Sequence, residues 1–96
     1  HKEGEFEWSK YNFEVSDVEK LVKLFEIYRE ETENILKEGL ILPAYHTFIK
    51  CSHIFNLLDA RGFFSTQERA RYIGMIRNLA KKIAGVYLEN ERGPSR

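Results

Sequence analysis

The chain has 96 residues, of which 43% are hydrophobic and 31% are charged, and its formal net charge is zero. This length fits one domain and leaves no room for a catalytic core beside a separate binding module. The composition excludes a disordered chain, and no run approaches the ~20 apolar residues of a membrane-spanning helix.

Cysteine usage and the N-terminal sequence limit the cellular setting. Cys51 is the only cysteine, which excludes an intrachain disulfide and a thiolate cluster for zinc or an iron–sulfur centre. The first ten residues contain no apolar run typical of a signal peptide. We therefore expect a cytoplasmic protein in a reducing compartment, without a membrane partner.

Charge is unevenly distributed along the chain. Residues 1–38 hold eleven acidic and six basic side chains, whereas residues 61–96 hold eight basic and three acidic ones. The basic end could turn toward an RNA or an acidic protein. Alternatively, the two ends are solvated faces that attract each other weakly.

The first fifteen residues alternate apolar and polar side chains at the period of a strand. No other segment of the chain offers a strand to pair with, and a lone strand is not stable in water. We therefore expect an extended arm over residues 1–15, packed on the helices or taken from a sheet upstream in a longer protein. Its apolar residues are Phe6, Trp8, Tyr11, Phe13 and Val15.

A first helix is expected over about residues 17–37. Ser16 and Glu19 have the spacing of a capping box, and Gly39 stands where a left-handed C-terminal cap would fall. Between them, apolar residues recur at helical spacing. These are Val18, Leu21, Val22, Phe25, Tyr28, Thr32, Ile35 and Leu36.

A second helix is expected over about residues 43–60, with Pro43 in its first turn. Its apolar side chains surround most of the helix axis and leave only a narrow polar strip of His46, Thr47, Lys50 and His53. Two neighbouring helices would leave part of such a helix in water. We therefore expect a surface from outside this chain to cover the remainder.

A third helix is expected over about residues 66–91, between the capping box Ser65–Glu68 and the stop Gly93-Pro94. Its apolar stripe consists of Ile73, Ile76, Ala80, Ile83 and Tyr87. The predicted fold class is all-α, an up-down-up three-helix bundle over residues 16–96 that follows the extended arm.

No catalytic signature is present in the sequence: there is no P-loop, dinucleotide fingerprint or nucleophile elbow. His46 and His53 share one face of the second helix, but ~10 Å separates them, which is too far for one metal ion. No catalytic, cofactor-binding or metal-ligating residue is predicted. His53 is expected to be a polar group in or beside the core.

Two groups of polar residues are candidate sites. Arg69 falls on the apolar side of the third helix and needs a partner, so we expect a structural network with Asn56 and Asp59. Cations on the opposite side either contact phosphate or are merely solvated. The candidate RNA or partner contacts are Arg71, Arg77, Lys81, Lys82 and His53.

Long irregular strings of the sequence resemble one known family. LPAYHTFIKCSHIFNLLDARG at 42–62 and STQERARYIGMIRNLAK at 65–81 are similar to the C-terminal helices of the glycyl-tRNA synthetase alpha subunit. WSKYNFEVSDVEKL at 8–21 resembles the segment that leaves the catalytic domain of that family. Departures from the family pattern are Cys51, Ile54, the pair Phe63-Phe64, and Gly74 inside the third helix.

The resemblance implies a class II synthetase of two alpha and two beta subunits, a ligase that uses ATP with magnesium to charge transfer RNA with glycine. It places the ATP- and glycine-binding motifs upstream of this sequence, so the fragment itself is expected to be inactive. The implied partners are the catalytic domain of the alpha subunit, the beta subunit and the glycine transfer RNA.

The leading hypothesis is a helical domain that supports subunit assembly and aminoacylation in the parent enzyme. The alternative is a free-standing helical regulator that binds DNA or a protein helix. In the DNA-binding version, the second and third helices would form a helix-turn-helix, and its groove-reading side chains would be Ser65, Thr66, Gln67 and Arg69.

Overall fold

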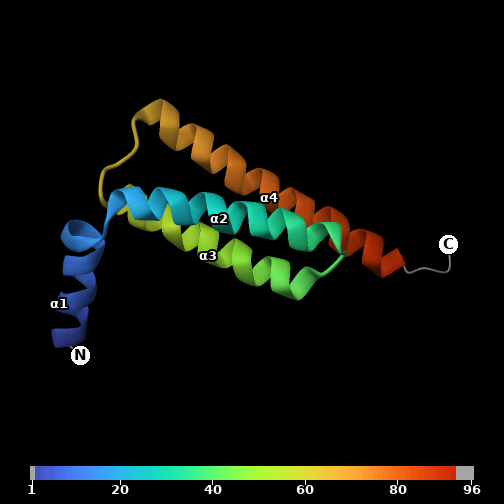
Figure 1. Ribbon diagram of the computed structural model, residues 1–96, viewed down its shortest axis with the longest axis horizontal. Helices are drawn as coiled ribbons and strands as arrows, with labels where there is room; N and C mark the ends of the chain where they lie inside the picture. The colour runs from blue at the N-terminus through green and yellow to red at the C-terminus, as the bar shows by residue number, and fades with distance from the viewer. Residues whose placement is uncertain (1, 93–96) are drawn as a thin grey trace.

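The structure is a computed structural model that describes residues 2–92 (Figure 1). In chain order its elements are α1 (Lys2–Lys10), the π-helix η1 (Tyr11–Val15), α2 (Val18–Lys37), α3 (Ile41–Ala60) and α4 (Thr66–Arg92). No strand occurs in this part of the chain, so the fold is all-α as predicted.

α2, α3 and α4 form the predicted up-down-up bundle. α2 and α3 lie antiparallel along most of their lengths. α4 begins after the C-terminal end of α3 and runs back obliquely over this pair (Figure 1). Their bounds lie within two residues of the predicted ones. The predicted stop of the third helix at Gly93-Pro94 lies outside the described residues.

Residues 2–15 are helical, so the expectation of an extended arm over residues 1–15 was wrong in conformation wherever the structure describes this segment. A helix satisfies its backbone amides within the segment, whereas a strand without a neighbour cannot. The Ser16 amide closes η1 by donating to the Tyr11 carbonyl oxygen at 3.0 Å. Lys10 and Glu14 add an i,i+4 ion pair at 3.6 Å. The alternation of apolar residues instead places them on two sides of a helix.

The start of α2 differs by one residue from the expected capping box of Ser16 and Glu19. The N-cap is Asp17, whose carboxylate accepts a hydrogen bond from the Lys20 amide at 3.2 Å. Ser16 is buried, and its carbonyl and hydroxyl oxygens accept hydrogen bonds from the Arg61 guanidinium. The serine is therefore used to hold α2 against the end of α3.

The start of α4 agrees with the predicted capping box. The Ser65 hydroxyl accepts from the Glu68 amide at 3.1 Å, and the Glu68 carboxylate accepts from the Ser65 amide at 3.4 Å. α3 begins at Ile41, two residues before the predicted start. Pro43 still lies in its first turn, where a missing amide hydrogen costs no helical hydrogen bond.

Two glycines end α2 and α3 and allow the tight connections between helices. Gly39 has φ +74°, and its amide donates to the Leu36 carbonyl while the Leu40 amide donates to that of Ile35. This pattern is the Schellman motif, which needs a left-handed residue after the helix. Gly62, with φ +67°, ends α3 in the same way.

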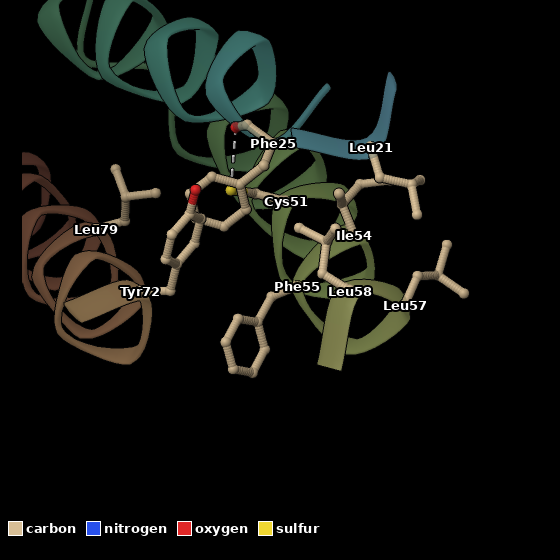
Figure 2. Packing of buried hydrophobic residues seen from close by; sticks show 9 residues of the cluster. All are labelled: Leu21, Phe25, Cys51, Ile54, Phe55, Leu57, Leu58, Tyr72 and Leu79. Carbon is tan, nitrogen blue, oxygen red and sulfur yellow. Dashed lines mark hydrogen bonds between the residues drawn. The ribbon is translucent and has the colours of Figure 1, made fainter. Parts of the chain in front are cut away.

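The core lies where α4 crosses α2 and α3 (Figure 2). Phe25 of α2 and Tyr72 of α4 have ring centroids 4.8 Å apart, and Leu79 is 1% exposed. The buried cluster comprises Leu21, Phe25, Cys51, Ile54, Phe55, Leu57, Leu58, Tyr72 and Leu79. α4 therefore buries Tyr72 and Leu79, whereas the predicted stripe lies to one side, with Ile73, Ile76 and Ile83 half-buried and Ala80 and Tyr87 exposed.

The molecule is long and flat, with principal extents of 53 × 35 × 17 Å. Its radius of gyration is 16.0 Å, whereas a compact domain of this length has about 12.5 Å. Two features account for the excess: α1 stands away from the bundle, and the C-terminal part of α4 extends past the ends of α2 and α3 (Figure 1). Much apolar surface therefore stays uncovered.

Candidate assembly and RNA-binding surfaces

The outer face of α3 is the uncovered side of its apolar surface and consists of Leu42, Tyr45 and Ile49. These side chains recur at i, i+3 and i+7, so they lie on one side of the helix. They are 80%, 53% and 47% exposed. The two neighbouring helices therefore leave part of α3 in water, as its sequence predicts.

Basic side chains border the outer face of α3. His46, Lys50 and His53 are all exposed and follow one another at i, i+4 and i+7. The Lys50 ammonium lies 5.7 Å from the centroid of the Tyr28 ring, which holds it beside α2. His53 is exposed, so the expectation that it lies in or beside the core was wrong.

The arm, which we define as α1 and η1 together, carries a second uncovered apolar surface. Trp8 is 65% exposed and Phe13 is 59% exposed. Trp8 and Tyr11 make an edge-to-face contact with ring centroids 6.2 Å apart. Within the described residues, α1 packs only against η1, and η1 contacts the bundle through α3.

The cations of α4 divide into two groups. Lys82 pairs with Glu33 of α2 at 2.8 Å, and the Arg71 guanidinium lies 5.1 Å from the centroid of the Tyr72 ring. Both therefore have structural contacts. Arg77 and Lys81 are exposed at i,i+4 spacing, and neither forms an ion pair with another residue between positions 3 and 92.

The structure brings together two of the three residues of the predicted polar network. The Arg69 Nε donates to the Asp59 carboxylate at 3.1 and 3.3 Å, and the guanidinium lies 6.0 Å from the centroid of the Phe55 ring. This contact links the end of α3 to the start of α4. Asn56 is exposed and makes no side-chain hydrogen bond to either residue of the pair.

An ion-pair chain on α2 reaches α4. Arg29 pairs with Glu26 and lies 3.6 Å from Glu33, which in turn accepts from Lys82. The hydrogen bond from Arg29 lowers the pKa of Glu26, and the hydrogen bond from Lys82 lowers the pKa of Glu33. These carboxylates are therefore held in their charged forms and help to place α4 against α2.

Two buried polar contacts were missed at the sequence level. Thr32 is fully buried, and its hydroxyl lies 2.7 Å from both the Tyr28 carbonyl oxygen and the Thr47 hydroxyl. Arg61 donates to Ser16 and so ties α3 to the root of the arm. A threonine on an apolar helix face signals the first contact, whereas no local pattern pairs Arg61 with Ser16.

The geometry argues against the helix-turn-helix alternative. α3 and α4 run in opposite directions, close to antiparallel (Figure 1), whereas the two helices of that motif cross at about 90–120°. The Ser65 hydroxyl, a candidate groove reader, is occupied as the cap of α4.

Between residues 3 and 92 no three His, Cys, Asp or Glu side chains gather as a metal-binding group. In the same part of the chain, no helix is long and apolar enough to cross a membrane.

These features define a class of protein: an all-helical bundle domain with uncovered apolar and basic surfaces. The family model of the glycyl-tRNA synthetase alpha subunit matches residues 1–92. The chain belongs to this family, as the resemblance in its sequence predicts. The family is that of an aminoacyl-tRNA synthetase, a ligase of protein biosynthesis, whose alpha subunit associates with a partner subunit.

Proposed function

We propose that this chain is the C-terminal helical domain of a cytoplasmic glycyl-tRNA synthetase alpha subunit and supports subunit assembly. The observation that carries this proposal is the exposed outer face of α3 in a chain of this family. Contiguous apolar surface of this kind marks a protein contact. The proposed partners are the catalytic domain of the alpha subunit and the beta subunit.

In this proposal, the chemistry belongs to the rest of the enzyme. A class II catalytic domain binds glycine and ATP with magnesium, and the 96-residue chain is inactive by itself. The support is the resemblance of residues 8–21 to the segment that leaves that domain. Glycine-dependent exchange between ATP and pyrophosphate by the 96-residue chain should not exceed background, and exchange above background would contradict the proposal.

The basic side of α4 supports a second role, contact with the backbone of the glycine transfer RNA. Arg77 and Lys81 are the cations best suited to bind phosphate because no carboxylate neutralises them within the described residues. Reversing both charges should weaken RNA binding and flatten its salt dependence. Reversing Arg71 and Lys82 should affect binding less, because these two side chains have contacts within the bundle.

The assembly role is tested by mixing the 96-residue chain with purified beta subunit, or with the catalytic part of the alpha subunit, and measuring the mass of the complex in solution. We expect a complex with one of them, and Leu42→Glu with Ile49→Glu should abolish it. Ile27→Glu is the matched control, because Ile27 is 56% exposed on α2, away from the outer face of α3. If the chain forms a complex with neither the beta subunit nor the catalytic part of the alpha subunit, the proposal is contradicted.

A further inference from the structure

α4 contains a long stretch without negative charge. Residues 69–88 hold five basic and no acidic side chains over about 30 Å of helix. Tyr72 and Leu79 face the core, so the opposite side of the helix, its outer side, faces solvent. Four exposed residues follow one another on this outer side at i, i+4, i+7 and i+11. These are Ala70, Gly74, Arg77 and Lys81.

The outer side of α4 carries an open hollow of about 500 Å³. Its lining residues are Thr66, Arg69, Ala70, Ile73, Gly74 and Arg77. Arg69 and Arg77 supply guanidinium groups to this hollow. Between them, Ala70 and Gly74 have almost no side chain, which leaves the helix backbone accessible from outside.

The bundle itself gives no reason for a glycine at position 74. Gly74 lies inside α4, where glycine is less stable than alanine. A methyl group on Gly74 would meet nothing within 4 Å, so no neighbouring element needs the space. A glycine on a helix surface lets another molecule approach the backbone closely. The hollow therefore suits a ligand that comes from outside the bundle.

The charge of the hollow comes mainly from Arg77, which forms no ion pair with another residue between positions 3 and 92. The Asp59 carboxylate accepts a hydrogen bond from the Nε of Arg69 and offsets part of its charge, yet the Arg69 side chain is still 52% exposed. Lys81 lies one turn beyond Arg77 and is also exposed. Cations in this arrangement suit a ligand with several phosphate groups.

The side chains around the hollow favour a double-helical nucleic acid over a single strand. Proteins hold single strands by stacking bases on aromatic side chains, and Tyr72, the only aromatic residue of segment 66–81, is buried. The exposed Thr66 hydroxyl and Asn78 amide can instead hydrogen-bond to ribose. Ribose 2′-hydroxyl groups line the wide minor groove of an RNA double helix, and DNA lacks them.

We propose that the hollow on the outer side of α4 binds the sugar–phosphate backbone of double-helical RNA, and that Gly74 is the residue that admits it. Arg77 and Lys81 bind phosphates, and Thr66 and Asn78 contact ribose. The inference rests on the proposed contact with transfer RNA and deepens it, because it assigns this contact to a base-paired stem.

Binding of the 96-residue chain to three probes tests the class of ligand. The probes are an RNA hairpin whose stem spans one helical turn, a DNA hairpin of the same sequence, and the unpaired RNA strand. Fluorescence anisotropy at one salt concentration should show that the RNA hairpin binds at least tenfold more tightly than the other two. Equal binding of the DNA hairpin or of the unpaired strand overturns the assignment to double-helical RNA.

Gly74→Gln tests the hollow, because glutamine fills it without a change of charge. Glutamine is also more stable than glycine inside a helix. Urea unfolding should therefore show a fold at least as stable as that of the unaltered chain, while the affinity for the RNA hairpin falls at least tenfold. RNA binding by the Gly74→Gln variant at the unaltered affinity overturns the hollow as the binding site.

Gly85→Gln is the matched control for this variant. Gly85 lies about 16 Å further along α4, and an added side chain there also meets nothing within 4 Å. Gly85 lines a separate groove between α2 and α4, however, together with Lys82 and Glu89. The Gly85→Gln variant should bind the RNA hairpin like the unaltered chain, and an equal loss of affinity in both glycine variants overturns the assignment to the hollow.

The phosphate contact is tested by the salt dependence of binding. Arg77→Gln should reduce the slope of log affinity against log salt concentration by about one. Arg92→Gln removes an exposed cation of the same helix outside the acid-free stretch and should leave the slope unchanged. An unchanged slope in the Arg77→Gln variant overturns the contact.

The outcomes also separate this inference from the proposed function. If reversing the charges of Arg77 and Lys81 abolishes RNA binding while Gly74→Gln does not weaken it, the hollow is overturned and the proposed RNA contact stands. A chain that binds none of the three probes contradicts both the hollow and the RNA contact. The assembly role keeps its own test through Leu42 and Ile49.

Discussion

Cys51 lies at the centre of the core, where α2, α3 and α4 meet (Figure 2). Its thiol is fully buried and donates a weak hydrogen bond to the Phe25 carbonyl oxygen at 3.6 Å. Burial raises the pKa of this thiol to about 11. The side chain therefore packs as a small apolar group, and its thiolate is suppressed.

Cys51 should act as a reporter of unfolding. In native buffer at pH 8, we expect a disulfide reagent such as dithionitrobenzoate to leave the thiol unreacted, because the thiol is buried and protonated. After unfolding in guanidinium chloride, one thiol per chain should react. Fast stoichiometric reaction of the folded protein would contradict the described packing.

The contacts and burial of single side chains could be predicted only where the spacing of residues in the sequence decides them. The Arg69–Asp59 contact follows from a charge on an apolar stripe, which needs a partner at the adjoining helix end. The burial of Tyr72 and Leu79 was missed because the more apolar stripe one position away fits the same helical period. Only the crossing of α4 over α2 and α3 decides between these two sides.

At the scale of elements, helix ends were more predictable than helix beginnings. Gly39 and Gly62 both adopt the left-handed backbone that a C-terminal cap requires. The N-cap of α2 is Asp17 and not the predicted Ser16, because both residue types can cap a helix and Ser16 instead accepts hydrogen bonds from Arg61. The arm was misread since its alternation of apolar residues fits a strand as well as a two-sided helix.

Two glycines should respond in opposite directions to the same substitution. Gly74 is exposed inside α4, and an added methyl group would meet nothing within 4 Å, so Gly74→Ala should stabilise the fold by up to about 1 kcal/mol. Gly62 has φ +67°, so Gly62→Ala should destabilise it by about 1 kcal/mol. Urea unfolding measures both. A stabilising effect of Gly62→Ala would contradict a left-handed C-terminal cap of α3 at this position.

The pair between Glu33 and Lys82 makes the packing of α4 on α2 depend on pH. Because the folded-state pKa of Glu33 lies below 4.5, the folded chain binds fewer protons than the unfolded chain just below pH 4.5. The stabilisation is therefore complete above that pH and is lost as the pH falls through the folded-state pKa.

Glu33→Gln should lower the free energy of unfolding at pH 7 by less than about 1 kcal/mol, because the pair is partly exposed. The same variant should lose less stability than the unaltered chain between pH 5 and pH 3. Glu38→Gln is the control, since Glu38 is exposed and forms no ion pair within residues 3–92. If the Glu33→Gln variant loses as much stability between pH 5 and pH 3 as the unaltered chain, the pair with Lys82 does not lower the pKa of Glu33.

At the scale of the whole molecule, the flat shape explains why apolar surfaces remain uncovered. A bundle 17 Å thick in its shortest dimension covers little more than one side of each helix. The sequence of α3 already predicts this, because its apolar residues surround most of the helix axis, which is more than two neighbouring helices can cover. Which surface meets which partner depends on contacts between molecules, and these leave no local period in the sequence.

The central claim is that the outer face of α3 is an assembly surface of a glycyl-tRNA synthetase alpha subunit, and the parent enzyme tests it most directly. Leu42→Glu with Ile49→Glu would be placed in the alpha subunit, and the mass of the assembled enzyme and its rate of glycine transfer to tRNA measured together. We predict that the assembled mass and the rate of glycylation both fall at least tenfold, while the helix content is unchanged. An enzyme that assembles and charges tRNA at the unaltered rate with both substitutions present would contradict the claim.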